Sequence, residues 1–200
     1  MNKRRVKSAD SRPKTGLDNK LRIIGGQWRG RKVSFPNSEG LRPTSDRVRE
    51  TLFNWLAPII PNANCLDLFA GSGALGFEAL SRGAAHIDLV DSSPTVVRHL
   101  QENLHLLNGN GSVWLEQAQS RLQHCQKKYD IIFLDPPFAQ NLLAPCIDLI
   151  EQHQLLTDQA WVYVETGNTE LLPNLPAHWK LHREKNAGQV CYRLFSIDAT

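Results

Sequence analysis

The sequence has no apolar run long enough to cross a lipid bilayer, so we expect no membrane-spanning helix. Residues 1–7 are basic but lead into polar sequence, which is unlike a secretory signal and predicts a cytoplasmic protein. The four cysteines are widely spaced and form no Cys-x-x-Cys pair, so we expect reduced, mostly buried thiols. None of the seven histidines lies at metal-ligand spacing from another ligand, and we therefore expect no metal cofactor.

Charge is distributed unevenly along the 200 residues, of which 41% are hydrophobic and 22% charged. The first 50 residues hold 14 of the 23 Lys and Arg and five of the 20 acidic residues, so the remainder is net acidic. A localised basic region indicates either a nucleic-acid contact or a solvated tail. We expect a disordered basic tail over residues 1–20, an extension over 21–60 and one main domain over 61–200.

The extension begins with two expected strands, over 21–24 and 31–35, which predict a small hairpin with a flexible, glycine-rich tip. Trp28 lies in that tip among Arg29, Arg31 and Lys32. An aromatic ring among cations is suited to stacking on an exposed base and binding phosphates. The alternative is that Trp28 covers an edge of the core, and the sequence favours neither.

A helix is expected after Pro43, with Thr44 or Ser45 as its N-cap and apolar residues at helical spacing up to Ile59. Arg42, Arg47 and Arg49 crowd its start. Cations are poorly placed at a helix start, where the macrodipole is already positive, so they indicate a partner such as phosphate. Pairing with nearby acids could account for one of them.

The rest of the chain alternates strands with helices, which predicts a doubly wound α/β sheet. The expected strands cover 64–68, 86–91, 112–116, 129–134 and 160–165, and the expected helices 74–81, 94–107, 118–125 and 142–152. A closing hairpin, over 179–183 and 189–195, would add one antiparallel strand.

Three glycines, Gly71, Gly73 and Gly76, follow the first of these strands in the spacing of a dinucleotide-binding loop, with Asp91 twenty residues after the first. Taken literally, this pattern predicts an NAD oxidoreductase. Asp67 argues against that reading, because a carboxylate at the strand end would repel a pyrophosphate. It would instead attract the ammonium of a methionine moiety.

The segment 129–138 is an apolar strand that ends in Asp135, Pro136, Pro137 and Phe138. Neither proline can stay in a central strand, so the chain must turn at Asp135. Asp135 can accept a hydrogen bond, the prolines hold a backbone carbonyl nearby, and Phe138 offers a stacking face. The tetrad therefore suits a planar group that bears an amino group, although a strand followed by incidental prolines would look the same.

Taken together, the glycine loop with Asp67, the acid at Asp91, the tetrad and the final hairpin resemble class I S-adenosylmethionine-dependent methyltransferases that act on exocyclic amines. The segments 22–31 and 41–56 resemble, more narrowly, the bacterial small-subunit ribosomal RNA guanine-N2 methyltransferases. The resemblance runs from about residue 21 to 195. It implies a Rossmann-like sheet, S-adenosylmethionine as cofactor and guanine 966 of 16S ribosomal RNA as target, in an assembled or assembling small subunit, with the enzyme a monomer.

The resemblance also implies roles for individual residues. Asp135, Pro136 and Phe138 would be catalytic. The cofactor would contact Asp67, Phe69, Gly71, Gly73, Asp91, Ser92, Gln117 and Ala118. The RNA would contact Arg22, Trp28, Arg29, Arg31, Arg42, Thr44, Arg47 and Arg49. Two further readings stay open: a DNA adenine-N6 methyltransferase, which uses the same tetrad, and a non-catalytic RNA-binding module.

Overall fold

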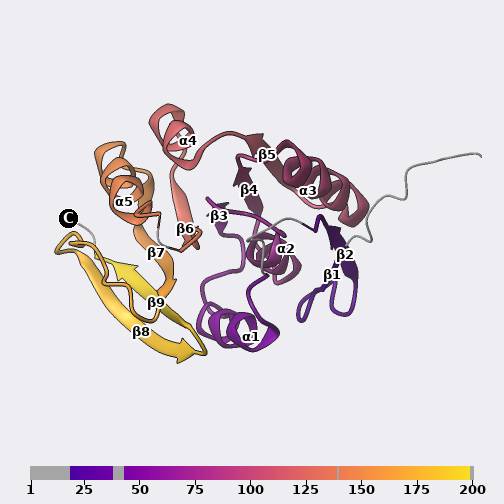
Figure 1. Ribbon diagram of the computed structural model, residues 1–200, viewed down its shortest axis with the longest axis horizontal. Helices are drawn as coiled ribbons and strands as arrows, with labels where there is room; N and C mark the ends of the chain where they lie inside the picture. Colours follow the sequence, from indigo (N-terminus) through magenta and orange to yellow (C-terminus); the bar gives the residue numbers. More distant parts are fainter. Residues whose placement is uncertain (1–18, 38–42, 139, 199–200) are drawn as a thin grey trace, which may run out of the picture.

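A seven-stranded sheet forms the centre of the molecule (Figure 1). The computed structural model describes residues 19–37, 43–138 and 140–198. The strands of this sheet lie in the order β5-β4-β3-β6-β7-β9-β8. Their bounds are β3 (Asn64–Asp67), β4 (His86–Asp91), β5 (Gly111–Leu115), β6 (Tyr129–Leu134), β7 (Leu156–Gly167), β8 (Trp179–Ala187) and β9 (Val190–Ile197).

All neighbouring strands from β5 to β7 pair in parallel, whereas β9 pairs antiparallel with both β7 and β8. Within the described residues, β9 is thus the single reversed strand of this sheet, as the closing hairpin predicts. The chain order reverses direction between β3 and β6, because β4 and β5 lie to one side of β3 and the later strands to the other. In such sheets ligands bind outside the carboxyl ends of the strands at this switch point.

In the part of the chain that the structure describes, five helices cover the two faces of the sheet: α1 (Asp46–Trp55), α2 (Ala74–Ser81), α3 (Pro94–Leu107), α4 (Ala118–His124) and α5 (Leu143–Gln152). Strand β6 shows the division, because successive side chains of a strand point to opposite faces. Ile131 and Phe133 join the cluster formed with α1, α2 and α3, whereas Ile132 and Leu134 join the cluster formed with α4 and α5. No helix in the described part of the chain is long and apolar enough to cross a membrane.

The helix starts follow the capping residues in the sequence. The Ser45 side chain accepts the Val48 N–H at the start of α1, and Ser93 accepts the Val96 N–H at the start of α3. Strand β7 extends beyond its expected bounds at both ends, and β8 extends beyond its expected C-terminal end. The four cysteines are free, and all are buried, which confirms the prediction of burial.

The N-terminal hairpin, β1 (Asn19–Arg22) and β2 (Lys32–Phe35), forms a separate two-stranded sheet beside α2 and α3 (Figure 1). Its tip is tied to α2, which contradicts the expectation of a flexible tip. The Gln27 and Trp28 backbone N–H groups donate to the Ser81 carbonyl and hydroxyl oxygens, at 2.7 and 2.9 Å, and the Ser81 hydroxyl donates to the Gly25 carbonyl.

The Trp28 side chain is 8% exposed and belongs to the main apolar cluster. The prediction that its ring stacks on RNA is therefore wrong for this structure, and the core-covering alternative holds. Burial of so large an apolar side chain contributes about 1.5–3 kcal/mol to folding. Trp28 thus fixes the hairpin onto the helices and strands of the main apolar cluster.

Candidate active site

Acidic side chains gather where four neighbouring strands end. Asp67 ends β3, Asp91 ends β4, Asp135 directly follows β6, and Glu165 lies near the end of β7. The register pairs Asp67 with Phe133 and Leu134 with Val164, so these acids share one edge of the sheet. This edge lies at the switch point between β3 and β6, where the topology predicts a ligand.

The glycine loop after β3 curls against two of these acids. Gly71 and Gly73 have φ angles of 49° and 77°, a left-handed conformation that glycine adopts without strain. The Gly71 N–H donates to Asp91 Oδ2 at 3.1 Å, and the Gly76 N–H donates to Asp67 Oδ2 at 3.1 Å. A Cβ at Gly73 would lie 2.2 Å from the Phe77 ring, so the loop has no room for a side chain there.

Burial raises the pKa of Asp67 to about 7. The Gly76 N–H opposes this shift, whereas the charge of Asp91 adds to it. Burial likewise raises the pKa of Asp91, although the Ser93, Gly71 and Ser92 N–H groups lower it. No ion pair of the described residues includes either carboxylate. Both are therefore suited to a positively charged or hydroxyl-bearing ligand.

The remaining predicted cofactor residues surround the same edge. Phe69 is half-buried after β3, and Ser92 is exposed after β4. Gln117 is exposed at the start of α4, and Ala118 behind it is 8% exposed. The Glu116 N–H donates to the Asp91 carbonyl at 3.1 Å, which holds the ends of β5 and β4 together. The loops after three neighbouring strands thus form one continuous rim.

The tetrad lies as its sequence suggests, at the turn that follows β6. Asp135 is half-buried, Pro136 is buried and Phe138 is 45% exposed. The Thr44 hydroxyl donates to Asp135 Oδ2 at 3.2 Å. Burial first, and then the charges of Glu165 and Asp67, raise the pKa of Asp135 well above its usual range, while the Thr44 hydroxyl lowers it.

Glu165 is a site residue that the sequence analysis missed. Its side chain is 5% exposed and accepts a hydrogen bond of 2.6 Å from the Tyr163 hydroxyl. Burial raises the pKa of Glu165. The signal that could have identified it is the one that identified Asp67 and Asp91, an apolar strand that runs into an acid.

The predicted RNA-binding arginines separate into exposed and buried groups. Arg22, Arg29, Arg31 and Arg47 are exposed. Arg49 is fully buried, with ion pairs to Asp46 at 2.6 Å and to Glu78 at 3.5 Å, so the prediction that it contacts RNA is wrong for this structure. The alternative of pairing with a nearby acid holds for it. Arg42 lies outside the described residues.

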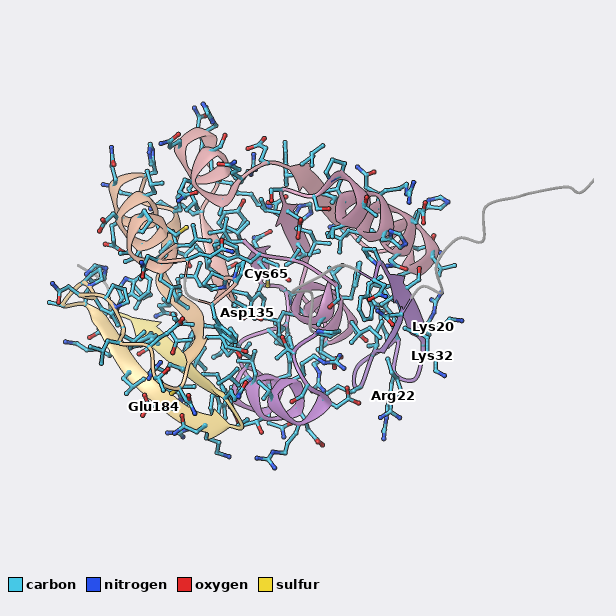
Figure 2. All side chains as sticks on the ribbon, viewed as in Figure 1. Lys20, Arg22, Lys32, Cys65, Asp135 and Glu184 are labelled. Atoms are coloured by element: carbon cyan, nitrogen blue, oxygen red, sulfur yellow. The ribbon has the colours of Figure 1, made fainter. Side chains whose placement is uncertain are left out.

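Two lysines extend the exposed cationic face of the hairpin. The register pairs Arg22 with Lys32 and Lys20 with Ser34, opposite to the face that buries Leu21 and Val33. Figure 2 shows Lys20, Arg22 and Lys32 at the outer side of the hairpin, and Asp135 lies towards the centre of the molecule in this view. We define these three residues as the hairpin cationic face.

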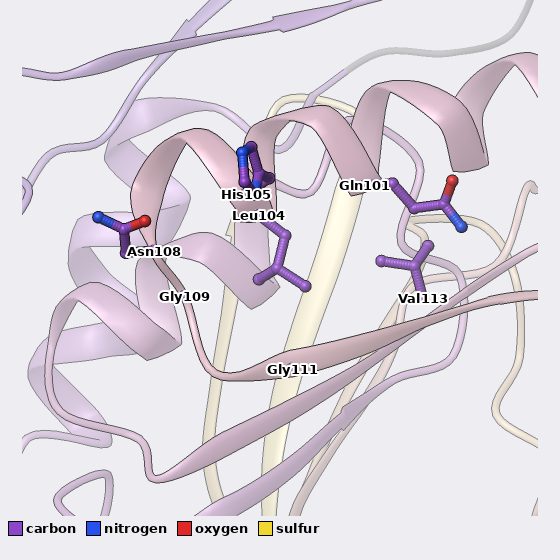
Figure 3. Close-up of a pocket in the computed structure, with 7 residues that line it drawn as sticks. All are labelled: Gln101, Leu104, His105, Asn108, Gly109, Gly111 and Val113. Carbon is purple, nitrogen blue, oxygen red and sulfur yellow. The ribbon is translucent and has the colours of Figure 1, made fainter.

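A shallow hollow of about 350 Å³ lies away from the acids, between α3 and β5 (Figure 3). It is lined by Gln101, Leu104, His105, Asn108, Gly109, Gly111 and Val113. Gly111 begins β5, so this part of the hollow lies at the opposite end of the strand from the acidic edge. None of the acids of the candidate site lines it, and the described residues contain no cluster of three or more metal-ligating side chains.

Comparison with known proteins gives consistent matches over nearly the whole chain. The family model described as conserved hypothetical protein 95 matches residues 21–196. Ribosomal RNA small subunit methyltransferase D of Escherichia coli K12 is 52% identical over 189 residues, which cover 94% of this chain and 96% of the relative. The protein of the same name from Haemophilus influenzae is 46% identical and covers 88% of this chain and 93% of the relative.

A solved structure agrees with these matches. It is that of an Escherichia coli protein described as a methyltransferase, 52% identical to this chain, with a TM-score of 0.84. The match covers 91% of this chain and 100% of the solved chain.

Proposed function

Because the chain belongs to the S-adenosylmethionine-dependent methyltransferases of small-subunit ribosomal RNA, we propose that it methylates the exocyclic N2 amine of one guanine in 16S ribosomal RNA. We further propose that this is guanine 966 and that the substrate is the assembled or assembling small subunit. The observation that supports amine chemistry is the Asp135 tetrad at the acidic edge of the sheet, with its acceptor carboxylate and exposed ring.

The residues at this edge fit S-adenosylmethionine. The narrow glycine loop allows close approach of a ligand, and Asp67 beside it offers a buried negative charge to an ammonium group. Asp91 is placed to accept ribose hydroxyls, and Gln117 and Ala118 border the expected adenine position. When bound, this cofactor supplies an electrophilic methyl group. The chain's own residues then hold and orient the amine that receives it.

Guanine N2 is a weak nucleophile because its lone pair is delocalised into the ring. In our proposal, Asp135 and the Pro136 carbonyl accept hydrogen bonds from the two N–H groups of the amine, and Phe138 stacks on the base. Holding reactants in the correct geometry can lower a barrier by roughly 7–11 kcal/mol. Asp135 does not need to be a strong base, because the amine becomes acidic only as the new bond forms. The carboxylate then takes the released proton.

The target base must leave its stack to reach such a pocket, at a cost on the order of a few kcal/mol. Contacts between phosphates and the exposed cations of the N-terminal extension would offset this cost. Those cations are the hairpin cationic face together with Arg29, Arg31 and Arg47. Thr44 and Asp135 touch each other, so the extension reaches the reacting edge of the sheet.

The test is to incubate the purified protein and labelled S-adenosylmethionine separately with 16S ribosomal RNA, small ribosomal subunits and DNA, and then to identify the labelled nucleoside. The proposal predicts N2-methylguanosine, and the preferred substrate shows whether free RNA or the particle is methylated. N6-methyladenine from DNA would support the DNA methyltransferase alternative. Absence of label from every substrate would contradict the methyltransferase proposal.

Replacing Arg29 or Arg47 with alanine should weaken RNA binding without changing cofactor affinity. Both side chains are exposed and make no ion pair within the described residues, so each is available to a phosphate. We expect the slope of log Kobs against log salt concentration to become less steep by roughly 1 for each lost contact. Filter binding over a salt series measures this slope. Lys128→Ala is the control, because Lys128 is an exposed cation just before β6, at the end of the strand opposite to Asp135. An equal change of slope in this variant would contradict specific RNA contacts by Arg29 and Arg47.

Replacing Glu165 with glutamine should move the acidic limb of the kcat–pH profile to lower pH. The Glu165 charge raises the pKa of Asp135, so its removal lets Asp135 ionise at lower pH. The profile should be recorded with saturating RNA and cofactor. Asp158→Asn, at the exposed far end of β7, is the matched control and should leave the limb in place. A limb that does not move in the Glu165 variant would show that Asp135 ionisation does not limit the rate.

A further inference from the structure

Asp135 is held by a residue from outside the main domain. The Thr44 hydroxyl donates to Asp135 Oδ2 at 3.2 Å, although 91 positions separate them in the chain. Thr44 lies just before α1, in the extension, and is half-buried. A hydrogen bond from a hydroxyl fixes one carboxylate oxygen and favours the ionised form. Within the described residues no hydrogen bond to the other oxygen of Asp135 is found, so this oxygen can accept from the substrate amine.

Thr44 is in turn held by a buried arginine. Arg49 Nε donates to the Thr44 carbonyl at 3.2 Å. The same guanidinium donates to the Arg22 carbonyl at 3.0 Å and pairs with Asp46 at 2.6 Å and with Glu78 at 3.5 Å. Its side chain is fully buried. A charged group is rarely buried unless it is paired and hydrogen-bonded. Arg49 meets this condition through partners at the end of β1, at the start of α1 and on α2.

Glu78 completes the link on the α2 side. Its carboxylate is fully buried, accepts the Ile24 N–H at 2.9 Å and pairs with Arg82 at 2.7 Å. Ile24 follows β1, so Glu78 and Arg49 both grip the end of the strand that carries Arg22. In Figure 1, α1 lies between this hairpin and the β8–β9 hairpin. The contacts therefore run without a gap from the hairpin cationic face to Asp135.

We propose that Thr44 and Arg49 are positioning residues: Thr44 orients the Asp135 carboxylate, and Arg49 holds Thr44 and ties its position to the RNA-facing hairpin. This proposal rests on the proposed function, because it assigns Asp135 the role described above. RNA bound to the hairpin and to the start of α1 would hold the Thr44 segment in the position that aligns Asp135. The buried Arg49 guanidinium then links RNA binding at the hairpin to the orientation of the Asp135 carboxylate.

The first test compares Thr44→Val with Thr44→Ser. Valine keeps the shape of the side chain but removes the donor, whereas serine keeps the hydroxyl. We expect Thr44→Val to lower kcat roughly 10-fold or more, the scale of a hydrogen bond to a charged group, with little change in KM for RNA or in cofactor affinity. Thr44→Ser should recover most of the rate. Equal kcat for valine and wild type would overturn the proposal.

A pH profile separates positioning from a loss of structure. The groups that face Asp135 are Glu165 and Tyr163 from β7, Asp67 from β3 and Thr44 itself. Of these, Thr44 lowers the pKa of Asp135. Thr44→Val should therefore move the acidic limb of kcat to higher pH, opposite in direction to Glu165→Gln. A limb that stays in place, or moves to lower pH, would contradict the role of Thr44.

The second test addresses Arg49. Lysine keeps the charge of Arg49 but cannot donate to four groups at once, so we expect Arg49→Lys to lower kcat. Arg82→Lys is the matched control, because Arg82 also pairs with Glu78 but, within the described residues, forms no hydrogen bond with Thr44. In the Thr44→Val background, Arg49→Lys should lower kcat no further, because Arg49 acts through Thr44. Additive losses, or an equal loss in Arg82→Lys, would overturn this part.

A measurement without turnover separates this proposal from the proposed function. The Asp135 carboxyl can be titrated by carbon-13 NMR in aspartate-labelled protein, with Asp135→Asn used to assign its signal. Thr44→Val should raise the observed midpoint and Thr44→Ser should restore it. If wild type methylates no guanine but this shift occurs, the proposed function fails and the hydrogen-bond link stands. If wild type is active and the shift is absent, the link fails alone.

Discussion

Replacing Asp135 with alanine abolishes methyl transfer to RNA while S-adenosylmethionine still binds. We expect kcat to fall by a factor of roughly 10³ or more, because the variant loses the one carboxylate that, in the proposed mechanism, both orients the amine and takes its proton. Asp135 lies after β6, whereas the glycine loop follows β3 and Asp91 ends β4, so the proposed cofactor contacts should remain in place. Asparagine keeps one acceptor oxygen, so Asp135→Asn should retain more activity than alanine.

Calorimetry with S-adenosylmethionine and single-turnover methylation together test this prediction. The alanine variant should transfer no methyl group, and its Kd for the cofactor should stay within about twofold of wild type. A twofold change is small, because a tenfold change corresponds to about 1.4 kcal/mol. Asp148→Ala is the control, because Asp148 is exposed on α5 and should leave both values unchanged. Equal loss of binding and turnover in Asp135→Ala would show that Asp135 is mainly a cofactor ligand.

Replacing Asp67 with asparagine removes the buried charge beside the glycine loop and should weaken S-adenosylmethionine binding. We expect Kd to rise roughly 10–100-fold, from the loss of about 1.5–3 kcal/mol in a hydrogen bond to a charged group. The amide has almost the same shape, so the fold should remain. Calorimetry measures the affinity, and unchanged Kd would contradict the placement of the methionine ammonium at Asp67.

The affinity for S-adenosylmethionine should also depend on pH, in a direction set by the pKa of Asp67. The pKa of Asp67 is about 7, and a cationic ligand favours the ionised carboxylate, so wild-type affinity should increase as pH rises towards 7 and beyond. The increase should end near pH 8, where an α-amino group loses its own proton. Asp67→Asn should lose this dependence below pH 7.

Stability provides the control for folding of the Asp67 variant. A carboxyl whose pKa is raised in the folded state binds more protons there than in the unfolded chain, so cofactor-free stability falls as pH rises from about 4 to 7. Asp67→Asn should remove this loss, and its Tm at pH 8 should be no lower than that of wild type. A variant that binds poorly and is also unstable would not support the ligand role.

Much of the fold follows from local patterns. Apolar strands alternate with helices whose starts carry their own caps, Ser45 and Ser93, and these elements lie close to their predicted bounds. The acidic edge also follows, because parallel strands end at the same edge, Asp67 and Asp91 end β3 and β4, and Asp135 directly follows β6. Sequence spacing alone is sufficient to place these three residues, since their positions depend on the strand that precedes each of them.

Local patterns do not predict the environment of a residue whose partner lies far along the chain. The cluster of cations at a helix start predicts that Arg49 contacts RNA, yet Glu78, 29 positions later, is buried with it. Trp28 was compatible with two environments, and the Ser81 contacts that bury it are 53 positions away. Glu165 was recognised as part of a strand, but its proximity to Asp135 depends on the pairing of β6 with β7. Tertiary pairing, rather than local propensity, decided all three.

The most direct measurement uses a bacterium from which its own member of this family has been deleted. The gene for this chain, or for its Asp135→Ala variant, is supplied, and the fragment of 16S ribosomal RNA that contains guanine 966 is analysed by mass spectrometry. We predict one added methyl group, on N2 of that guanine, with the wild-type gene and none with the variant. Methylation at another position, or an unmethylated fragment with well-expressed wild-type protein, would contradict the proposed function.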